Sequence, residues 1–405
     1  MNALRTLSAA LAALLALAPA AASASGFVVY EMSGEGMAKG SAVAADSDEP
    51  AALWYNPGSM AFLPDASVTV GVLAALGLAT FEPASGGPDQ EANKDIYWLP
   101  RLFADVAVTD WMHAGLGVYS IYGLGLSWKN DWVGREDGIA AEMATVSFNP
   151  AVSFRILKNV GLGIGFVAMK ASADLTNGLP EVAGGDVRFG GEAWAFGGHA
   201  GLTIKGIADM LDIGLAYRSR MNATFDGRVD FDPYPEFARK LVDQEASAGI
   251  TMPDIFTLGF GLDATQRLRL NADVNLVLWQ VYDETVLALD DGSKLATVHD
   301  YEPSIIARLG MELRPEAVDG LAIRAGLNYD QSPAPDGKVS PTMPDAEKVN
   351  LTAGLGYRVS WFRGDLGYMF MYYLPNEVRG ADVSPDGTYK TTGHLLALTL
   401  SAVVE

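Results

Sequence analysis

The chain has 405 residues, of which 49% are apolar and 44 are glycine, and its formal net charge is −21. This charge argues against nucleic acid as a partner, because phosphate binding requires clustered lysine and arginine. Cysteine is absent, which excludes disulfide bonds, a thiolate nucleophile and any cysteine-based metal site. After residue 25 no run of about 20 apolar residues occurs, so the sequence offers no candidate for a membrane-spanning helix.

The first residues have the organisation of a secretory signal. Arg5 precedes a stretch rich in alanine and leucine over residues 9–18, and Ala22-Ser23-Ala24 offers small residues for cleavage. A retained anchor helix is the alternative, but Pro19 and the short apolar stretch disfavour it. We expect residues 1–24 to be a cleaved signal peptide, so the mature protein is exported.

Residues 25–65 lack strand-like alternation. They are rich in glycine, alanine and serine, then acidic, and Trp54 and Tyr55 are followed by an Asn-Pro-Gly turn. A disordered tail is one interpretation and a folded plug is the other. Two aromatic residues beside a turn favour packing, so we predict that residues 25–65 form a hatch.

From about residue 66 onward, apolar and polar residues alternate in segments separated by turn residues. A period of two indicates β-strands whose two faces meet different surroundings. A soluble β-sandwich would also alternate, but it is usually built from shorter strands. One of the clearest segments has Leu268, Leu270, Ala272, Val274, Leu276 and Leu278 on one face and Arg269, Asn271, Asp273 and Asn275 on the other.

About fourteen such segments follow one another, and long connections such as 227–250 and 284–299 alternate with short ones such as 109–111. An even number of strands with long loops at one end and tight turns at the other is typical of an outer-membrane barrel, whose closure leaves no unpaired edge in lipid. We predict an all-β fold, a 14-stranded antiparallel transmembrane β-barrel over residues 66–405 with the hatch in its lumen. The expected strands are 66–80, 94–108, 112–127, 141–157, 160–174, 190–206, 210–226, 251–263, 267–283, 300–314, 320–331, 347–360, 361–374 and 390–404.

Catalytic and metal-binding motifs are missing from the sequence. No G-x-S-x-G elbow occurs, which argues against a serine hydrolase. The four histidines lie at positions 113, 199, 299 and 394, without the i, i+4 spacing of a helical zinc pair. We therefore expect no enzymatic activity, no cofactor and no protein-built metal site, and leave open a cation bound by the loops.

Several short motifs occur together in one order along the mature chain. They are Gly26-Phe27, Asn56-Pro57, Tyr122-Gly123-Leu124, Tyr217-Arg218-Ser219, Pro253-Asp254, Tyr329-Asp330-Gln331-Ser332-Pro333 and Pro344-Asp345-Ala346. In this combination the chain resembles the FadL family of outer-membrane transporters of hydrophobic compounds. Two features depart from the family: Gly58 stands where alanine is usual, and the chain ends in Val403-Val404-Glu405 without a terminal aromatic residue.

The resemblance implies a monomeric barrel in the bacterial outer membrane, surrounded by its lipid and plugged by its own hatch. Family members carry long-chain fatty acids or aromatic and aliphatic hydrocarbons inward by diffusion. The ligand is captured among extracellular loops, passes a lumen pocket that touches the N-terminus, and leaves sideways at a kink in the third strand. An apolar solute enters lipid more cheaply than water, so such release is physically favourable. A polar-solute porin and a structural or adhesive barrel are the alternatives, and the substrate itself is left open.

The resemblance also indicates residues that touch the ligand or gate its passage. Phe27, next to Gly26 at the tip of the hatch, is expected to contact the ligand, although an aromatic residue there could simply pack. The Asn-Pro-Gly turn at 56–58 would tie the hatch to the barrel wall, either as a gate or as an ordinary turn. Gly123 is the candidate for the third-strand kink, because glycine within a strand often marks a bulge.

Further candidates come from the residues themselves. Arg324, on the polar face of its strand, could meet the carboxylate of a fatty acid. Pairing with a neighbouring acid such as Asp330 is the alternative, and the same choice applies to Arg269, Arg308 and Arg363. In the long connection 227–250, four apolar residues could form an outer capture surface or simply pack within the loop: Phe231, Tyr234, Phe237 and Leu241.

Overall fold

A computed structural model describes residues 27–46, 48–181, 184–236, 241–335, 338–381 and 384–404. The predicted signal peptide at 1–24, Gly26 at the predicted hatch tip and Phe237 of the predicted capture surface lie outside these ranges. None of the helices in the described part of the chain has the length and hydrophobicity needed to span a membrane.

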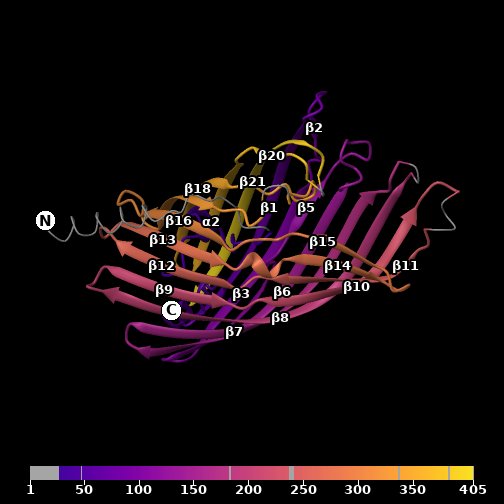
Figure 1. The fold of residues 1–405 in the computed structure, drawn as a ribbon. Helices are drawn as coiled ribbons and strands as arrows, with labels where there is room; N and C mark the ends of the chain where they lie inside the picture. The colour runs from indigo at the N-terminus through magenta and orange to yellow at the C-terminus, as the bar shows by residue number, and fades with distance from the viewer. Residues whose placement is uncertain are drawn as a thin grey trace.

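The strands form one closed 14-stranded antiparallel barrel, which confirms the predicted fold class. Closure comes from β1, which pairs with β21 from Ala66 opposite Val404 to Pro83 opposite Gly387. In Figure 1 the yellow β21 accordingly lies beside the indigo β1. The unbroken barrel strands are β1 (Ala66–Pro83), β3 (Ile96–Thr109), β6 (Ala140–Leu157), β7 (Val160–Gly178), β8 (Asp186–Ile207), β16 (Ser304–Leu313), β17 (Leu321–Asp330), β18 (Lys348–Val359), β19 (Phe362–Tyr373) and β21 (Gly387–Val404).

The other barrel strands are each interrupted once along their length. An interruption frees backbone groups from the ladder and lets the wall bend inward at that point. The interrupted strands are β4/β5 (Met112–Tyr119 and Leu124–Ser127), β9/β10 (Leu211–Arg218 and Met221–Asp232), β11/β12 (Gln244–Met252 and Ile255–Asp263) and β13/β14 (Leu268–Val277 and Glu284–Leu289). Short loop strands complete the sheet: β2 (Gln90–Glu91), β15 (Lys294–Val298) and β20 (Asn376–Val378).

The connections are long at one end of the barrel, the loop end, and short at the other, the turn end. Two predicted long loops are shorter than expected. The predicted loop 227–250 is mostly strand, because β10 continues to Asp232 and β11 begins at Gln244. The predicted loop 284–299 contains the β14–β15 hairpin. In Figure 1 the β10–β11 hairpin projects at the end opposite the C-terminus. The strands therefore continue into segments that were predicted as loops, beyond the strand length needed to cross the membrane.

Several strands expose apolar residues outward and bury polar residues in the lumen, whereas β10 does the reverse, with Phe225 buried and Thr224 exposed. On β13 the outward Leu270 and Leu276 are exposed, whereas the inward Asn271, Asp273 and Asn275 are buried. The outer face therefore suits lipid, and the inner face must find polar partners inside the barrel.

The partner of the inner face is residues 27–65, here called the N-terminal segment. It contains two short α-helices, α2 (Gly34–Ala38) and α3 (Ala52–Tyr55), and the 3₁₀-helix η1 (Pro57–Phe62), and most of its residues are buried. Ser33 caps α2, since its Oγ accepts a hydrogen bond from Gly36 N at 2.9 Å. The segment is thus a compact body with its own local structure.

Lumen-facing glycines allow this segment to lie directly on the wall. A Cβ atom added to Gly367 would lie 2.5 Å from the carbonyl oxygen of Gly34, and one added to Gly310 would lie 2.5 Å from that of Lys39. The backbones meet without intervening side chains, which is a specific use of glycine in strands. The glycine belt comprises Gly163, Gly201, Gly214, Gly259, Gly310, Gly326, Gly354 and Gly367.

Candidate functional site: a cavity beside the N-terminal segment

The start of the N-terminal segment fills the interruption between β4 and β5. Val28 forms an antiparallel bridge with Tyr122. Val29 N donates to Ile121 O at 2.8 Å, and Gly123 N donates to Phe27 O at 3.1 Å. The first described residues therefore act as a short added strand, at the position where the sequence predicted a kink. Gly123 lies within this interruption.

The Phe27 side chain is enclosed by aromatic rings. Its ring centroid lies 5.0 Å from that of Trp279, 5.8 Å from that of Tyr122 and 5.9 Å from that of Tyr282, in edge-to-face arrangements. Trp279 begins the 3₁₀-helix η2 (Trp279–Val281), which interrupts β13/β14. One side chain of the N-terminal segment thus bridges two interrupted wall strands across the lumen.

A cavity of about 500 Å³ adjoins Phe27, Tyr122 and Gly123. It is also lined by Ile96 and Trp98 of β3, whose side chains are 53% and 65% exposed on the outside of the barrel. The β3–β4 ladder ends at Leu102 opposite Val118, and the described residues of β5 pair with β6 but not with β3. The cavity is therefore lined both by residues that face the lumen and by residues that lie on the outside of the barrel.

The cavity is mostly apolar, with a few charged groups at its margin. Lys348 is buried there; its Nζ lies 3.3 Å from Asp330 Oδ2 and 5.1 Å from the centre of the Tyr373 ring. Such a lining, with a small number of polar groups, is typical of sites for hydrophobic small molecules, and the volume lies in their usual range.

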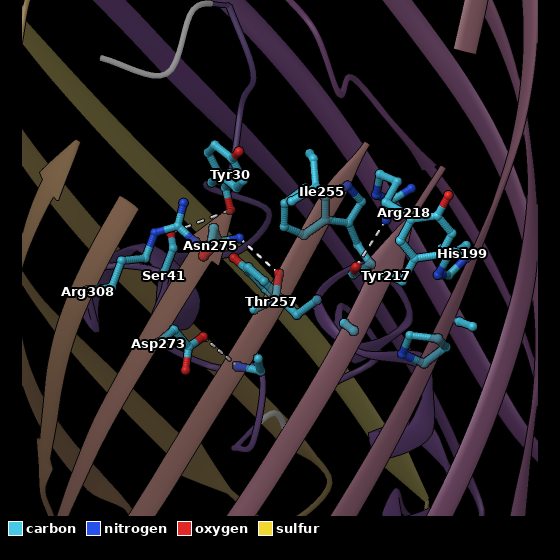
Figure 2. Close-up of a pocket in the computed structure, with 16 residues that line it drawn as sticks. Tyr30, Ser41, His199, Tyr217, Arg218, Ile255, Thr257, Asp273, Asn275 and Arg308 are labelled. Atoms are coloured by element: carbon cyan, nitrogen blue, oxygen red, sulfur yellow. Dashed lines mark hydrogen bonds between the residues drawn. The ribbon is translucent and has the colours of Figure 1, made fainter. Parts of the chain in front are cut away.

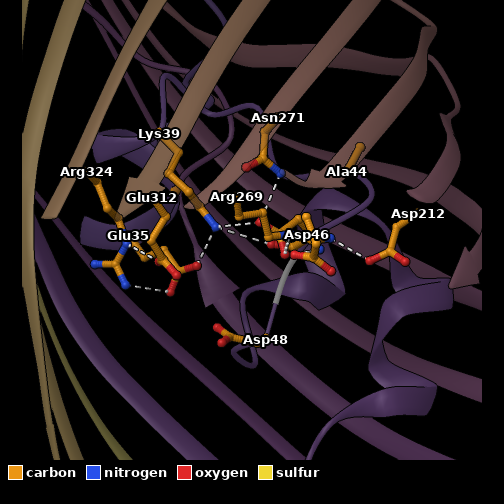
Figure 3. Close-up of polar contacts among 12 residues, drawn as sticks. Glu35, Lys39, Ala44, Asp46, Asp48, Asp212, Arg269, Asn271, Glu312 and Arg324 are labelled. Carbon is orange, nitrogen blue, oxygen red and sulfur yellow. Dashed lines mark hydrogen bonds and ion pairs between the residues drawn. The ribbon is translucent and has the colours of Figure 1, made fainter. Parts of the chain in front are cut away.

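Charged residues attach the N-terminal segment to strand β13 of the wall (Figure 3). Lys39 Nζ lies 2.6 Å from Glu35 Oε1 and 3.1 Å from Asp46 Oδ2. Arg269 of β13 in turn contacts Asp46 at 2.6 Å and Asp212 at 2.5 Å. Both partners of each pair are largely removed from water, so the network resists separation of segment and wall.

Arg324, predicted as a possible carboxylate receptor, already has carboxylate partners. Its guanidinium lies 2.6 Å from Glu312, 2.7 Å from Asp365 and 3.5 Å from Glu35. The neighbouring Arg363 also pairs with Asp365, at 2.7 Å. A ligand role for Arg324 stays a prediction, and its place in the structure is that of a charge partner for the N-terminal segment.

The turn at Asn56, Pro57 and Gly58 is bound to β8. Asn56 Nδ2 donates to Leu202 O at 3.1 Å and to Thr203 Oγ1 at 3.0 Å. A methyl group on Gly58 would lie 2.8 Å from the carbonyl oxygens of Gly161 and Gly201, which gives a physical reason for glycine at this position. The structure places the turn against the wall, and a gating role stays a prediction.

A capture role for Phe231, Tyr234 and Leu241 stays a prediction. Phe231 lies in β10 and packs against the buried core, Tyr234 is 52% exposed beside Gly184, and Leu241 is half-buried. None of these three lines the cavity described above. The sequence did not single out Lys348, nor Trp279 and Tyr282 as partners of Phe27. The sequence signal that could have pointed to Trp279 and Tyr282 is their Trp-x-x-Tyr spacing directly after the alternating segment 268–278.

A family model described as "Outer membrane protein transport protein (OMPP1/FadL/TodX)" matches residues 15–402. The chain belongs to this family. Among its relatives, a "Long-chain fatty acid transport protein" of Escherichia coli O6:H1 is 23% identical over 389 residues, which cover 86% of each chain. "Outer membrane protein P1" of Haemophilus influenzae is 21% identical over 414 residues, which cover 89% of each chain.

Solved structures show the same fold for this FadL-family chain. A Pseudomonas aeruginosa FadL homologue superimposes with a TM-score of 0.83 at 19% identity, covering 93% of this chain and 99% of the other. The Pseudomonas putida toluene transporter TodX gives 0.72 at 17% identity, covering 95% and 100%. Membership of the family makes the chain an outer-membrane transport protein rather than an enzyme, as the sequence predicted.

Proposed function

We propose that this barrel carries long-chain fatty acids or hydrocarbons across the outer membrane by diffusion and releases them sideways through its wall. One observation carries the proposal: the cavity beside Phe27 reaches the lipid-facing residues Ile96 and Trp98 where β3 and β5 do not pair. An apolar solute that enters this cavity can pass into lipid without crossing water, which is its cheaper route.

The N-terminal segment supports a sideways route through the wall because it obstructs the axial path through the lumen. Its backbone lies against the glycine belt, and its charged residues pair with wall residues. We infer that it acts as a fixed plug, and that only its first residues, beside Tyr122 and Gly123, move when ligand passes. A polar-solute porin would need an open axial path, which this packing opposes.

The relatives' names support the substrate class, since they include long-chain fatty acid and toluene transporters. A cavity of about 500 Å³ has room for an aromatic hydrocarbon or for part of an acyl chain. A single chain contains the barrel, the plug and the cavity, so we expect a monomer surrounded by outer-membrane lipid to be the active unit.

The test is to obstruct the wall opening without disturbing the plug. A Cβ atom added to Gly123 would meet its nearest neighbours only at 3.8–4.0 Å, and because Gly123 lines the cavity we expect the ring of Gly123→Phe to occupy it. We expect Gly123→Phe to lower the uptake of labelled oleate or toluene at least tenfold in cells with equal amounts of folded barrel. The matched control is Gly249→Phe on β11, where nothing lies within 4 Å. Unchanged uptake by Gly123→Phe would refute lateral release.

A further inference from the structure

Charged side chains at the margin of the cavity beside Phe27 bear on which hydrophobic molecules it can hold. Three carboxylates line the cavity, those of Glu31, Glu142 and Asp345, and the only cationic side chain in its described lining is that of Lys348. A fatty acid differs from a hydrocarbon in carrying a carboxylate that is ionised at neutral pH. The charges of the lining can therefore discriminate between these two classes of ligand.

Lys348 is the lining residue that could attract a ligand carboxylate, and it already has acidic neighbours. Its Nζ lies 3.3 Å from Asp330 Oδ2, and the negative charge of Asp345 also acts on it. The ammonium lies 5.1 Å from the centre of the Tyr373 ring, and only 5% of the lysine side chain is exposed. Two carboxylates and an aromatic face thus surround one positive charge. A ligand carboxylate would have to displace one of them or remain without a cation.

The carboxylate of Asp345 is held in place by its own hydrogen bonds. Ser332 Oγ donates to Asp345 Oδ2 at 2.9 Å, and the backbone amide of Ala346 donates to Oδ1 at 3.1 Å. Asn376 Nδ2 donates to the carbonyl oxygen of the same residue at 2.8 Å. Asp345 cannot turn away from the cavity without losing these contacts, so a ligand carboxylate would meet its negative charge.

Two arginines that act on Glu31 do not reverse this balance. The charges of Arg308 and Arg101 both act on the Glu31 carboxyl group, but neither arginine lines the cavity. Figure 2 shows Arg308 in a separate, smaller pocket together with Tyr30 and Asp273, and Asp273 is a further carboxylate on which Arg308 acts. Carboxylates therefore still outnumber cations when both arginines are added to the count.

The energetic consequence differs between the two classes of ligand. Removing a carboxylate from water costs several kcal/mol unless a cation and hydrogen bonds offset the loss of hydration. A hydrocarbon has no charge to offset and gains free energy from burial of its surface. The same molecule also suits the lipid-facing side of the cavity at Ile96 and Trp98, where a charged group would be unfavourable.

We propose that this cavity selects uncharged hydrophobic molecules such as hydrocarbons, and that Asp330, Asp345 and Lys348 together exclude fatty-acid carboxylates. The inference rests on the proposed function, since it takes the cavity to lie on the transport route. It adds which of the two substrate classes can use that route. Asp345 is the residue expected to control the preference, because it lines the cavity whereas Asp330 does not.

The first test compares two probes that share a ring system and differ by one carboxylate, naphthalene and 2-naphthoate. The full barrel in lipid nanodiscs is dialysed against each labelled probe at pH 7, and binding by Gly123→Phe nanodiscs, with the cavity obstructed, is subtracted. We expect specific binding of naphthalene by the wild type, and specific binding of 2-naphthoate that is weaker by about tenfold or more.

The possible results separate this inference from the proposed function. Specific binding of 2-naphthoate as strong as that of naphthalene would overturn the selection against charge and leave the transport route standing. Specific binding of neither probe would overturn both, because the cavity would then not be a ligand site.

The second test removes the charge of Asp345. Asp345→Asn keeps the size of the side chain and one acceptor oxygen, and we expect it to raise the ratio of 2-naphthoate to naphthalene binding about threefold or more. A ratio is unaffected by partial loss of folded barrel. The matched control is Asp319→Asn, which removes the same charge from an exposed turn residue outside the cavity. Equal ratios in the two variants would contradict the role assigned to Asp345.

Discussion

The Phe27 ring lies edge-on to the indole of Trp279, with 5.0 Å between the ring centroids and 63° between the ring planes. Trp279 follows β13 where that strand is interrupted, and the backbone of Phe27 is bonded to Gly123 in the interruption of β4/β5. The start of the N-terminal segment is therefore held at two irregular places of the wall, one by side-chain packing and the other by backbone hydrogen bonds.

Phe27→Ala should release the start of the segment from the wall. Replacing a buried phenylalanine with alanine costs about 3 to 5 kcal/mol. The two backbone hydrogen bonds that would still hold the segment contribute only about 1 kcal/mol each. Hydrogen exchange should show the amide of Val29, now bonded to Ile121 O, losing its protection. Tyr234→Ala, at an exposed ring, is the control, and full protection of Val29 in Phe27→Ala would show that the ring does not hold the segment.

Gly201→Ala should weaken the seating of the plug. The added methyl group would collide with Asn56 Oδ1, in a turn that is itself bonded to β8. Crowding of this kind costs about 1 to 3 kcal/mol, measurable as a lower free energy of unfolding by urea in detergent micelles. Gly249→Ala, with nothing within 4 Å, should be neutral. Equal stability of the two variants would count against close seating.

Arg324→Met should be destabilising. Removing this guanidinium takes one arginine partner from Glu312 and from Asp365, although Arg314 and Arg363 still lie 2.7 Å from them. Loss of one partner of a buried pair costs about 3 to 5 kcal/mol, and the two retained arginines should keep the loss at or below this range. Urea unfolding measures the loss. If the variant is as stable as the wild type but binds oleate more weakly, Arg324 serves the ligand rather than the plug.

Stability should also depend on pH through Glu49 of the N-terminal segment. Burial, reinforced by the charge of Asp365, raises the pKa of Glu49 from 4.5 to about 8. The folded protein then holds a proton that the unfolded chain releases, so this group makes stability fall as pH rises from about 4.5 to about 8. Each pKa unit corresponds to about 1.4 kcal/mol.

Glu49→Gln removes that titration and should flatten the dependence of the urea midpoint on pH within the same window. The variant should exceed the wild type in stability at pH 8. The groups near Glu49 include Glu35 and Asp365, whose carboxylate oxygens lie within 4.8 Å of it and of each other. If the urea midpoint of the wild type instead rises between pH 5 and pH 8 relative to that of Glu49→Gln, the pKa of Glu49 is not raised by folding and the prediction is wrong.

The barrel could be predicted from sequence because the alternation of apolar and polar residues indicates which side of a strand faces lipid. The predicted strand 66–80 corresponds to β1 (Ala66–Pro83), and the predicted strand 320–331 to β17 (Leu321–Asp330). Interruptions are harder to predict, since the residues that satisfy a broken ladder come from elsewhere in the chain. The predicted strand 267–283 thus runs through the end of β13 at Val277 and through η2.

The roles of the lumen arginines could not be predicted for a related reason. Arg308 and Arg324 both point inward from neighbouring strands, yet among the described residues no carboxylate lies at ion-pair distance from Arg308, whereas three lie at that distance from Arg324. The difference depends on where Glu35 and Tyr30 of the N-terminal segment come to lie against the wall. No strand pattern encodes that position.

The glycine belt also bears on the order in which the protein folds. Gly34 N donates to Thr399 Oγ1 at 3.3 Å, across 365 positions of sequence, and its carbonyl oxygen lies against Gly367. Contacts of such long sequence separation form only after the intervening chain has been organised. We therefore expect the N-terminal segment to reach its final place late in folding, after β19 and β21 have formed the wall against which Gly34 lies.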